Sequence, residues 1–466
     1  MLADDGECVY DSESPDGSEA DAGGAATPNA EPDDGGDEPD APPEPTTVYV
    51  SPSGSEGADG TVDDPLLSIN AAIDAAAEAG LDSVTLCDGI YREQVVVTVP
   101  VTLRGTVCPG SDLPADSPYP AVLAPSDEGL ALLVDGVAGG VVVRDLEVRA
   151  QDAAQPGASS IAVFVRASEN VSFLGSRLVA GDAADGAAGA VEPFEFPQLF
   201  PGNDGSDSAG GGFTLCECPD GARTSGGGGG SPMPGGQPGG TGTPDAEAGL
   251  GGTVLECLAN TGGHHGAAGE AGADGPGATM RGELSRAGWT PADGADGQNG
   301  RPGQGGGGGA SVDSTGGGGG GSCGGCGGAA ARGGRGGGAS IALLVYDSSV
   351  RVDACTLSSG QGGDGGNGAP GQAGQPQDEL GGTRAGGACN GGRGGPGGDG
   401  GASGGGAGGS SIGILFLGQA PQVDSLEFSI GDPGSAGVGG DPGVNDGVHG
   451  LAAEAVDTGN LNEPGS

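Results

Sequence analysis

Residues 340–346 read SIALLVY, and residues 350–360 read VRVDACTLSSG and end on a glycine. Read in steps of two, the two stretches form a short apolar strand, a polar corner and a second strand that ends on the glycine. The pattern recurs at 411–431, at 160–181 and, more weakly, at 130–148. A unit that cannot bury its own apolar face, repeated four times, predicts an all-β solenoid in which the copies stack.

The chain is strongly acidic. It has 466 residues, with 64 aspartates and glutamates against 15 basic residues, and a formal net charge of −49. This charge argues against anionic partners, namely nucleic acid and an anionic membrane surface. It favours solubility and loose binding of divalent cations. No apolar run approaches the ~20 residues of a membrane helix, so we expect no membrane insertion of this chain.

Ten cysteines, an even number, indicate disulfides and an oxidising compartment. The first six residues carry neither the charged nor the apolar region of a secretory signal. Two explanations stay open: a signal upstream of this start, or a cytosolic protein with free thiols. We favour the first and expect an extracellular or cell-surface protein.

The first 45 residues predict a disordered acidic linker, because their hydrophobic residues are too few to offset the entropy of folding. We expect order to begin at 46, with an amphipathic helix over 68–79. Its signals are an N-cap serine, an apolar stripe and a C′ glycine: Ser68; Ile69, Ala72, Ile73 and Ala76; Gly80. Such a helix would cover the open end of the solenoid, whose edge strands would otherwise pair with another molecule.

Four motifs at the start of this part resemble a known family: VYVSP at 48–52, PLLSI at 65–69, DGIYRE at 88–93 and VTLRG at 101–105. They look like the opening module of bacterial right-handed parallel β-helix proteins of the pectin-lyase-like superfamily. The resemblance covers 47–107 in motif and the later repeats in pattern. It implies a short right-handed parallel β-helix with an N-terminal capping helix. It says less about activity, because one fold hosts many functions.

Long glycine-rich segments interrupt the repeats, and the chain has 111 glycines. We expect the β-helix over 46–182, 339–360 and 410–431, glycine-rich insertions over 183–338 and 361–409, and a glycine-rich tail over 432–466 that does not return. The insertions leave after Gly181 and Gly360 and come back at Ser340 and Ser411. They therefore leave from one corner of successive repeats and lie on one face.

Glycine occupies every third position in five tracts: 263–275, 294–309, 362–374, 391–400 and 431–443. A polyproline-II or polyglycine-II helix has three residues per turn, so this spacing leaves one side without side chains. Such sides let neighbouring helices approach closely enough for backbone and Cα–H···O hydrogen bonds. The insertions resemble the polyglycine-II bundles of some phage tail-fibre adhesins and of a glycine-rich antifreeze protein. The alternative is a disordered low-complexity loop.

Eight cysteines are disulfide candidates: Cys87, Cys108, Cys216, Cys218, Cys257, Cys323, Cys326 and Cys389. The first two are about one coil of the implied β-helix apart, and equivalent positions of stacked coils lie at bridging distance. Buried free thiols are the alternative. The other six lie in the first two insertions, where cross-links would stabilise segments with almost no core. Their pairing is open, and a zinc site from the CxxC at 323–326 with Cys216 and Cys218 is a less favoured alternative.

Metal-binding and catalytic signals are weak. Aspartates at turns offer loose calcium candidates, Asp364, Asp399, Asp432 and Asp441, and we expect no other cofactor. The resembling hydrolases carry clustered aspartates, a Gly-His-Gly and an Arg-x-Lys, whereas this chain has no lysine and its histidines lie outside the coils. The resembling lyases need an acid cluster for calcium and an arginine base. Asp145 and Glu147 alternate with Arg144 and Arg149, which we interpret as outward-facing charge on a strand.

These patterns predict a non-enzymatic secreted or cell-surface protein for adhesion, or for binding extracellular polysaccharide or surface matrix. The alternative is a degenerate or divergent polysaccharide lyase or glycoside hydrolase. A third function, ice or mineral binding by the glycine array, lacks a regular threonine ladder. The ligand and the oligomeric state do not follow from the sequence.

Overall fold

The computed structural model describes residues 46–244 and 248–462, which belong to one unit of the chain. The predicted linker over 1–45 lies outside the described residues. Within the described ranges, no helix is long and apolar enough to cross a membrane.

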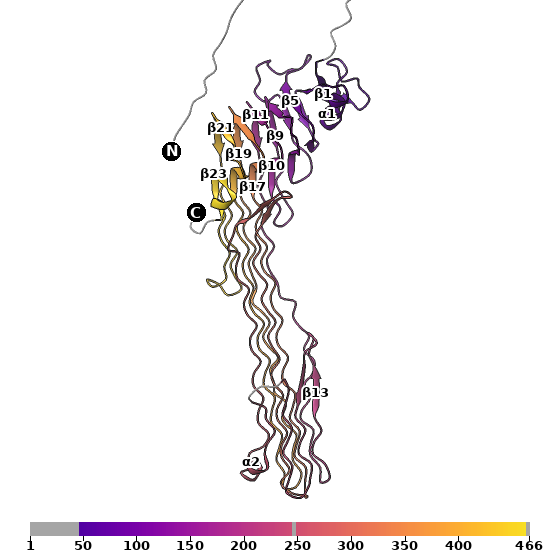
Figure 1. Cartoon of the computed structure of the whole chain (residues 1–466), viewed down its shortest axis with the longest axis vertical. Coiled ribbons are helices and arrows are strands. Elements are labelled where there is room, and N and C mark those ends of the chain that lie inside the picture. The colour runs from indigo at the N-terminus through magenta and orange to yellow at the C-terminus, as the bar shows by residue number, and fades with distance from the viewer. Residues whose placement is uncertain (1–45, 245–247, 463–466) are drawn as a thin grey trace, which may run out of the picture. The chain divides into compact units, whose positions relative to one another are not determined.

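Three parallel sheets dominate the structure (Figure 1). Sheet A contains β1 (Val48–Ser55), β2 (Ser83–Cys87), β5 (Val101–Thr106), β8 (Val141–Arg144), β11 (Val171–Leu174), β18 (Val350–Asp353) and β21 (Gln422–Asp424). Sheet B contains β3 (Gly89–Tyr91), β6 (Ala121–Leu123), β9 (Leu146–Arg149), β12 (Arg177–Val179), β19 (Thr356–Ser358) and β22 (Glu427–Ser429). Sheet C contains β4 (Val95–Val97), β7 (Leu130–Asp135), β10 (Ser160–Arg166), β17 (Ser340–Tyr346), β20 (Ser411–Leu417) and β23 (Ala452–Asp457).

From β2 onward, the chain adds one strand to sheet A, one to sheet B and one to sheet C, and then repeats the circuit. Each new strand pairs in parallel with the equivalent strand of the previous circuit. This confirms the all-β class, and the parallel sheets fit a β-helix-like fold.

The core is made of columns of side chains that point inward from stacked strands. In sheet A, Val84, Leu103, Val143, Phe173 and Val352 lie side by side in register and are at most 2% exposed. Burying each side chain of this kind contributes about 1.5–3 kcal/mol. The column ends at the equivalent residue of β21, which no further strand covers and which is 54% exposed.

Helix α1 (Ile69–Glu78) lies against β1, β2 and β4 at the first end of the sheets. The Ser68 side chain caps it by accepting from the N–H of Ala71, and the predicted apolar stripe is the buried face. Glu93 accepts from the Ile69 N–H at 2.6 Å and from the Ser68 hydroxyl at 2.8 Å. A carboxylate at a helix N-terminus satisfies N–H groups that have no partner within the helix.

Three buried serines, which we call the serine ladder, begin β10, β17 and β20 in register: Ser160, Ser340 and Ser411. Each serine ends a segment that leaves the sheets and comes back. Its hydroxyl donates at 2.7 Å to the backbone carbonyl of the residue where that segment begins: Ser160 to Gln151, Ser340 to Gly181, and Ser411 to Gly360. Ser340 also accepts from the Gly360 N–H at 2.8 Å. The residues that mark the corner in the sequence are therefore bonded directly to each other.

The glycine-rich segments leave after sheet B, come back at sheet C and run side by side in between (Figure 1). Gly263, Gly266, Gly269, Gly272 and Gly275 donate to carbonyls that also advance by three residues, from Asn390 to Ala402, at 2.8–2.9 Å. The tract at 294–309 donates in the opposite sense, to carbonyls descending from Gly334 to Gly319. The triplet register of the sequence is thus the register of the hydrogen bonds between segments.

Glycine is required where segments touch. A Cβ on Gly308, Gly400 or Gly306 would lie within 3.0 Å of backbone atoms of a neighbouring segment, a distance that real Cβ atoms essentially never show. Because backbone atoms cannot rotate away as a side chain can, any other residue forces the segments apart. Close packing replaces the apolar core that these segments lack.

Three smaller elements belong to the first glycine segment: the antiparallel hairpins β13 (Thr214–Glu217)–β14 (Arg223–Gly226) and β15 (Gly282–Ser285)–β16 (Gly288–Pro291), and helix α2 (Val254–Leu258). In Figure 1, α2 is labelled near the end of the glycine segments away from the sheets.

The expectation that the last glycine segment does not return is wrong. It comes back as β23, which pairs in parallel with β20, and it ends in helix α3 (Thr458–Leu461), whose Leu461 is fully buried. The sequence signal is weak because β23 reads AAEAVD, with alanines where the other strands carry isoleucine and leucine.

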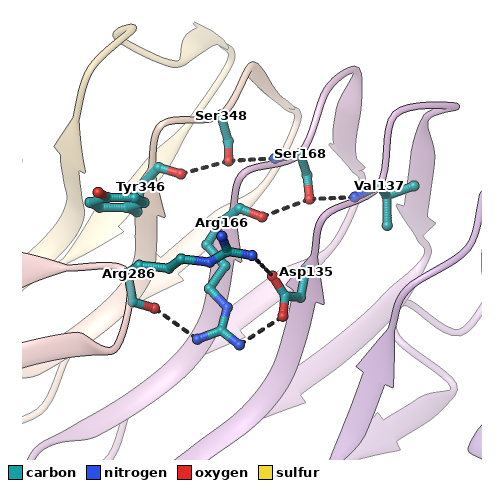
Figure 2. Close-up of polar contacts among 7 residues, drawn as sticks. All are labelled: Asp135, Val137, Arg166, Ser168, Arg286, Tyr346 and Ser348. Carbon is teal, nitrogen blue, oxygen red and sulfur yellow. Dashed lines mark hydrogen bonds and ion pairs between the residues drawn. The ribbon is translucent and has the colours of Figure 1, made fainter.

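Hairpin β15–β16 is joined to sheet C by a polar cluster, which we call the junction (Figure 2). Arg166 of β10 donates to the Asp135 carboxylate and to the Arg286 carbonyl, both at 2.7 Å. The Arg286 guanidinium lies 3.6 Å from the other oxygen of Asp135. Trp289 and Leu284 of the hairpin belong to the same buried apolar cluster as Phe164 of β10. This hairpin, which lies well inside the first glycine segment in sequence, is therefore fixed to sheet C.

Candidate functional site

The first candidate site lies at the corner between sheets A and B. Asp145, Gly175, Ala354 and Ser425 occupy equivalent corners of successive circuits, with φ of 51–56°. Neighbouring corners are bonded by backbone hydrogen bonds, for example from the Asp145 N–H to Leu174 at 3.1 Å. Short polar residues and glycine tolerate this left-handed conformation best. Asp145 is therefore at a corner, and the single strand expected around it is two strands, β8 and β9.

The Asp145 carboxylate is shared by two arginines on neighbouring strands of sheet A. Arg144 lies 2.9 Å from it and Arg104 lies 3.9 Å from it. The two guanidinium groups remain about half exposed, at 43% and 56%. Two positive charges on one carboxylate leave an excess of one positive charge at this point.

Glu147, two residues further on, shows the same arrangement. It pairs with Arg149 on its own strand and with Arg177 on β12, at 3.4 Å for the latter. Its side chain is only 7% exposed, whereas both arginines are 41–49% exposed. Glu147 faces outward as expected, because its neighbours Leu146 and Val148 are the ones that pack in the core. It differs from ordinary surface charge in that two arginines cover it. We call Arg104, Arg144, Arg149 and Arg177 the arginine patch.

A cavity of about 360 Å³ is lined by Arg104 of the arginine patch and by its partner Asp145. The other lining residues are the corner residues Gly175 and Ala354, residues 105–107 and the loop at 115–120. Polar and aromatic groups line it, including Ser117 and Tyr119, and Asp116 adds a carboxylate. The loop is anchored because Asp88 accepts from the Cys108 N–H and the Ser111 hydroxyl, at 3.1 and 2.7 Å. We call this cavity the corner groove.

The four calcium candidates lie on the glycine segments. The Asp364 carboxylate accepts from the Ser435 N–H at 2.7 Å, and the Asp399 carboxylate accepts from the Gly374 N–H at 2.8 Å. Asp432 and Asp441 contact neighbouring residues through backbone groups. Over the described ranges, no group of three acidic, histidine or cysteine side chains is placed to hold a metal ion.

Asp364 and Asp399 belong to a larger set of side chains that accept a backbone N–H from the next segment. The set includes Asp182, Asp185, Asp274, Asp293, Asp296, Asn299 and Asn367, at 2.7–2.8 Å. His265 and His449 do the same through Nδ1. Asp204 accepts from both the hydroxyl and the N–H of Thr383, which lowers the pKa of its carboxyl. These side chains satisfy N–H groups at the edges of the glycine segments.

Eight cysteines form four disulfides: Cys87–Cys108, Cys216–Cys323, Cys218–Cys326 and Cys257–Cys389. The thiols considered for zinc are thus all used in bridges. The free cysteine among the described residues, Cys355, is buried, and burial raises the pKa of its thiol. Four disulfides indicate an oxidising, extracellular environment.

Comparison with known proteins gives little. No family model and no curated protein matches the chain. A solved structure that matches is a rhamnogalacturonan lyase, with a TM-score of 0.23 and 15% identity. The match covers 30% of this chain and 38% of that one, and with so low a TM-score it carries no argument.

Sequence patterns missed the corner groove because it depends on three-dimensional neighbours. Arg104 and Arg144 share an acid because β5 and β8 are in register, although 40 positions separate them in the numbering. For a second surface, which lies on the glycine segments, the sequence did carry a signal. Four of the eight phenylalanines lie outside the repeats, at 194, 196, 200 and 213.

Proposed function

We propose that this protein is a secreted or cell-surface binding protein without enzymatic activity, which adheres to an extracellular polysaccharide or surface matrix. The arginine patch carries the proposal. Four half-exposed arginines share two carboxylates in a chain whose net charge is −49. Arginine forms bidentate bonds to carboxylate and sulfate groups, so acidic sugars are the ligands that this patch suits.

The corner groove supports the same ligand class. It is open, and its lining is mostly polar: hydroxyl, aromatic and backbone groups with Arg104 and the carboxylates of Asp116 and Asp145. Such a surface suits a hydrated chain of sugars more than a small apolar molecule. The anchored loop holds the groove open before the ligand binds, which reduces the entropy cost of binding.

In this proposal the three sheets form a short right-handed parallel β-helix, since parallel crossovers are almost always right-handed. The glycine segments form a bundle of polyglycine-II-like helices, as the three-residue period of their hydrogen bonds suggests. The bundle would act as a stiff extension of the β-helix.

The alternative function is a divergent polysaccharide lyase or hydrolase. A lyase would need an arginine free to act as a base, and Arg144, Arg149 and Arg351 are each engaged with a carboxylate here. Inverting and retaining hydrolases need two carboxyl groups flanking the bond to be cut. Asp145 and Glu147 are instead each paired with two arginines.

Binding of a soluble polyuronide, measured by calorimetry, tests the proposal, and an assay for unsaturated products with calcium present tests for turnover. We expect binding that weakens with salt, that falls at least tenfold in Arg104→Gln/Arg144→Gln, and that releases no product. Arg301→Gln is the matched control, because this exposed arginine pairs with Glu270 on a glycine segment. Turnover that disappears in Arg144→Gln, Arg149→Gln or Arg351→Gln would establish the enzyme instead.

A further inference from the structure

An apolar surface lies on the glycine segments around hairpin β13–β14 and contains no residue of the arginine patch. Phe200, Phe213, Leu215 and Leu380 form it and are 52–68% exposed. We call it the hairpin surface. Phe200 and Leu215 line one cavity of about 430 Å³ together with Asn203, Asp204 and Thr214. Leu380 belongs to the adjacent segment, since its carbonyl accepts from the Gly202 N–H at 2.9 Å.

The exposure of these side chains is unusual for this chain. It has eight phenylalanines, and those in the repeats are buried or packed against the core. The four at 194–213 include none that is buried. Single exposed apolar residues are ordinary on protein surfaces, whereas several together mark an interaction site.

The hairpin is held rigidly while its apolar side faces outward. Along β13, Thr214 and Cys216 are buried and alternate with the exposed Phe213 and Leu215. Two disulfides, Cys216–Cys323 and Cys218–Cys326, join the hairpin to the segment behind it. The Thr214 hydroxyl adds a hydrogen bond to the Gly321 carbonyl at 3.0 Å. The apolar face is therefore presented in a fixed geometry, which lowers the entropy cost of binding.

Acidic residues surround this surface. Asp204 lies in the cavity, Glu217 follows Leu215 on the outward side of β13, and Asp378 and Glu379 directly precede Leu380. Glu217 has Arg223 at 3.7 Å as a basic neighbour. The edge of the surface is therefore negative.

We propose that the hairpin surface docks a protein partner whose contact face is apolar in the centre and basic at its edge. Charge complementarity favours this partner. A second copy of this chain would bring the same acids against themselves, and an anionic lipid surface would be repelled as well.

The test uses the full chain and a fluorescent peptide of alternating lysine and leucine, with a peptide of alternating glutamate and leucine as its counterpart. We expect saturable binding of the lysine peptide, weakened by salt, and no binding of the glutamate peptide. Phe213→Ser/Leu215→Ser should weaken binding at least tenfold, because such central apolar residues dominate binding energy. Leu113→Ser is the matched control, since this leucine is 45% exposed on another surface.

A rim variant, Glu217→Gln/Asp378→Asn, keeps the test informative if the serine variant folds poorly, and it should weaken binding of the lysine peptide several-fold. Equal binding of both peptides, or binding unchanged in both variants, would overturn the proposal. Two other results would also overturn the proposal: self-association that depends on concentration, or binding of neutral oligosaccharides, if Phe213→Ser/Leu215→Ser abolishes it. Either result would show that the hairpin surface binds something other than the proposed partner.

Discussion

Replacing Gly308 by alanine measures how closely the glycine segments are packed. Gly308 is buried, its N–H donates to the Gly240 carbonyl at 2.8 Å, and its carbonyl accepts from the Gly252 N–H at 2.8 Å. A Cβ at this position would lie within 3.0 Å of the Gly228 carbonyl carbon and oxygen and of the Gly229 nitrogen. All of these are backbone atoms, so the segments themselves must separate.

The expected cost follows from two effects. Forcing one methyl group into a packed interior costs about 1–3 kcal/mol. Lengthening two backbone hydrogen bonds costs about 1 kcal/mol each. Alanine also has less conformational entropy than glycine in the unfolded chain, which offsets about 0.4–1 kcal/mol of this loss. The net loss is about 3 kcal/mol, which corresponds to a roughly 100-fold larger equilibrium constant for local opening.

Amide hydrogen exchange of the segments around Gly240, Gly252 and Gly308 measures this loss. Gly228→Ala is the matched control within the same segments, because the nearest atoms to its added Cβ lie at 3.6 and 3.7 Å, an ordinary contact. We expect the control to change exchange less than fivefold. If the amides of the Gly308→Ala and Gly228→Ala variants exchange at the same rates, the segments are not packed as described. That result would refute the explanation of why glycine is required at 308.

Three further predictions concern the junction, the serine ladder and one disulfide. The hydrogen bond from Arg166, with nearby arginine charge, holds the pKa of the Asp135 carboxyl below its usual value. That contribution is present above the unfolded pKa and is lost as pH falls through the folded one. Asp135→Asn should therefore lower the melting temperature at pH 7 but not in strong acid, and an equal loss at both would contradict this origin. Ser340→Ala leaves the half-buried Gly360 N–H and Gly181 carbonyl without their hydroxyl partner. Each lost hydrogen bond costs about 0.5–1.5 kcal/mol, so denaturant unfolding should show a loss of about 1–3 kcal/mol; a loss below about 0.5 kcal/mol would mean that the hydroxyl is not needed. Cys257→Ser/Cys389→Ser removes a disulfide whose cysteines are 132 residues apart. In the chain-entropy model such a disulfide stabilises the fold by about 5 kcal/mol, so limited proteolysis of the variant should cut near α2 first. A variant that resists proteolysis as well as the wild type would contradict this prediction.

Much of the secondary structure could be predicted because local patterns determine it. The residues of the apolar stripe before Gly80 are the residues that α1 buries, and the apolar run of 340–346 falls on β17. The three-residue spacing of glycine also predicted where the hydrogen bonds lie, because each glycine of 263–275 donates one hydrogen bond to a neighbouring segment.

What could not be predicted depends on which segments become neighbours. The partner of Cys257 is Cys389 because two distant glycine segments end close together, and nothing local encodes that. Asp145 occupies a left-handed corner that sequence patterns assign to glycine. The return of the chain as β23 was hidden because its alanines carry too little hydrophobicity to distinguish a strand from the surrounding low-complexity sequence.

The serine ladder also bears on how such a protein changes over generations. Its hydroxyls close loops whose ends are 9, 159 and 51 residues apart with the same 2.7 Å bond. Doubling a flexible loop adds only about 0.6 kcal/mol to its closure cost, and each serine bonds the two ends of its own loop whatever lies between them. Whole triplets can therefore be gained or lost within a glycine segment without disturbing the strands on either side. The reach of the glycine segments can evolve independently of the sheets that carry them.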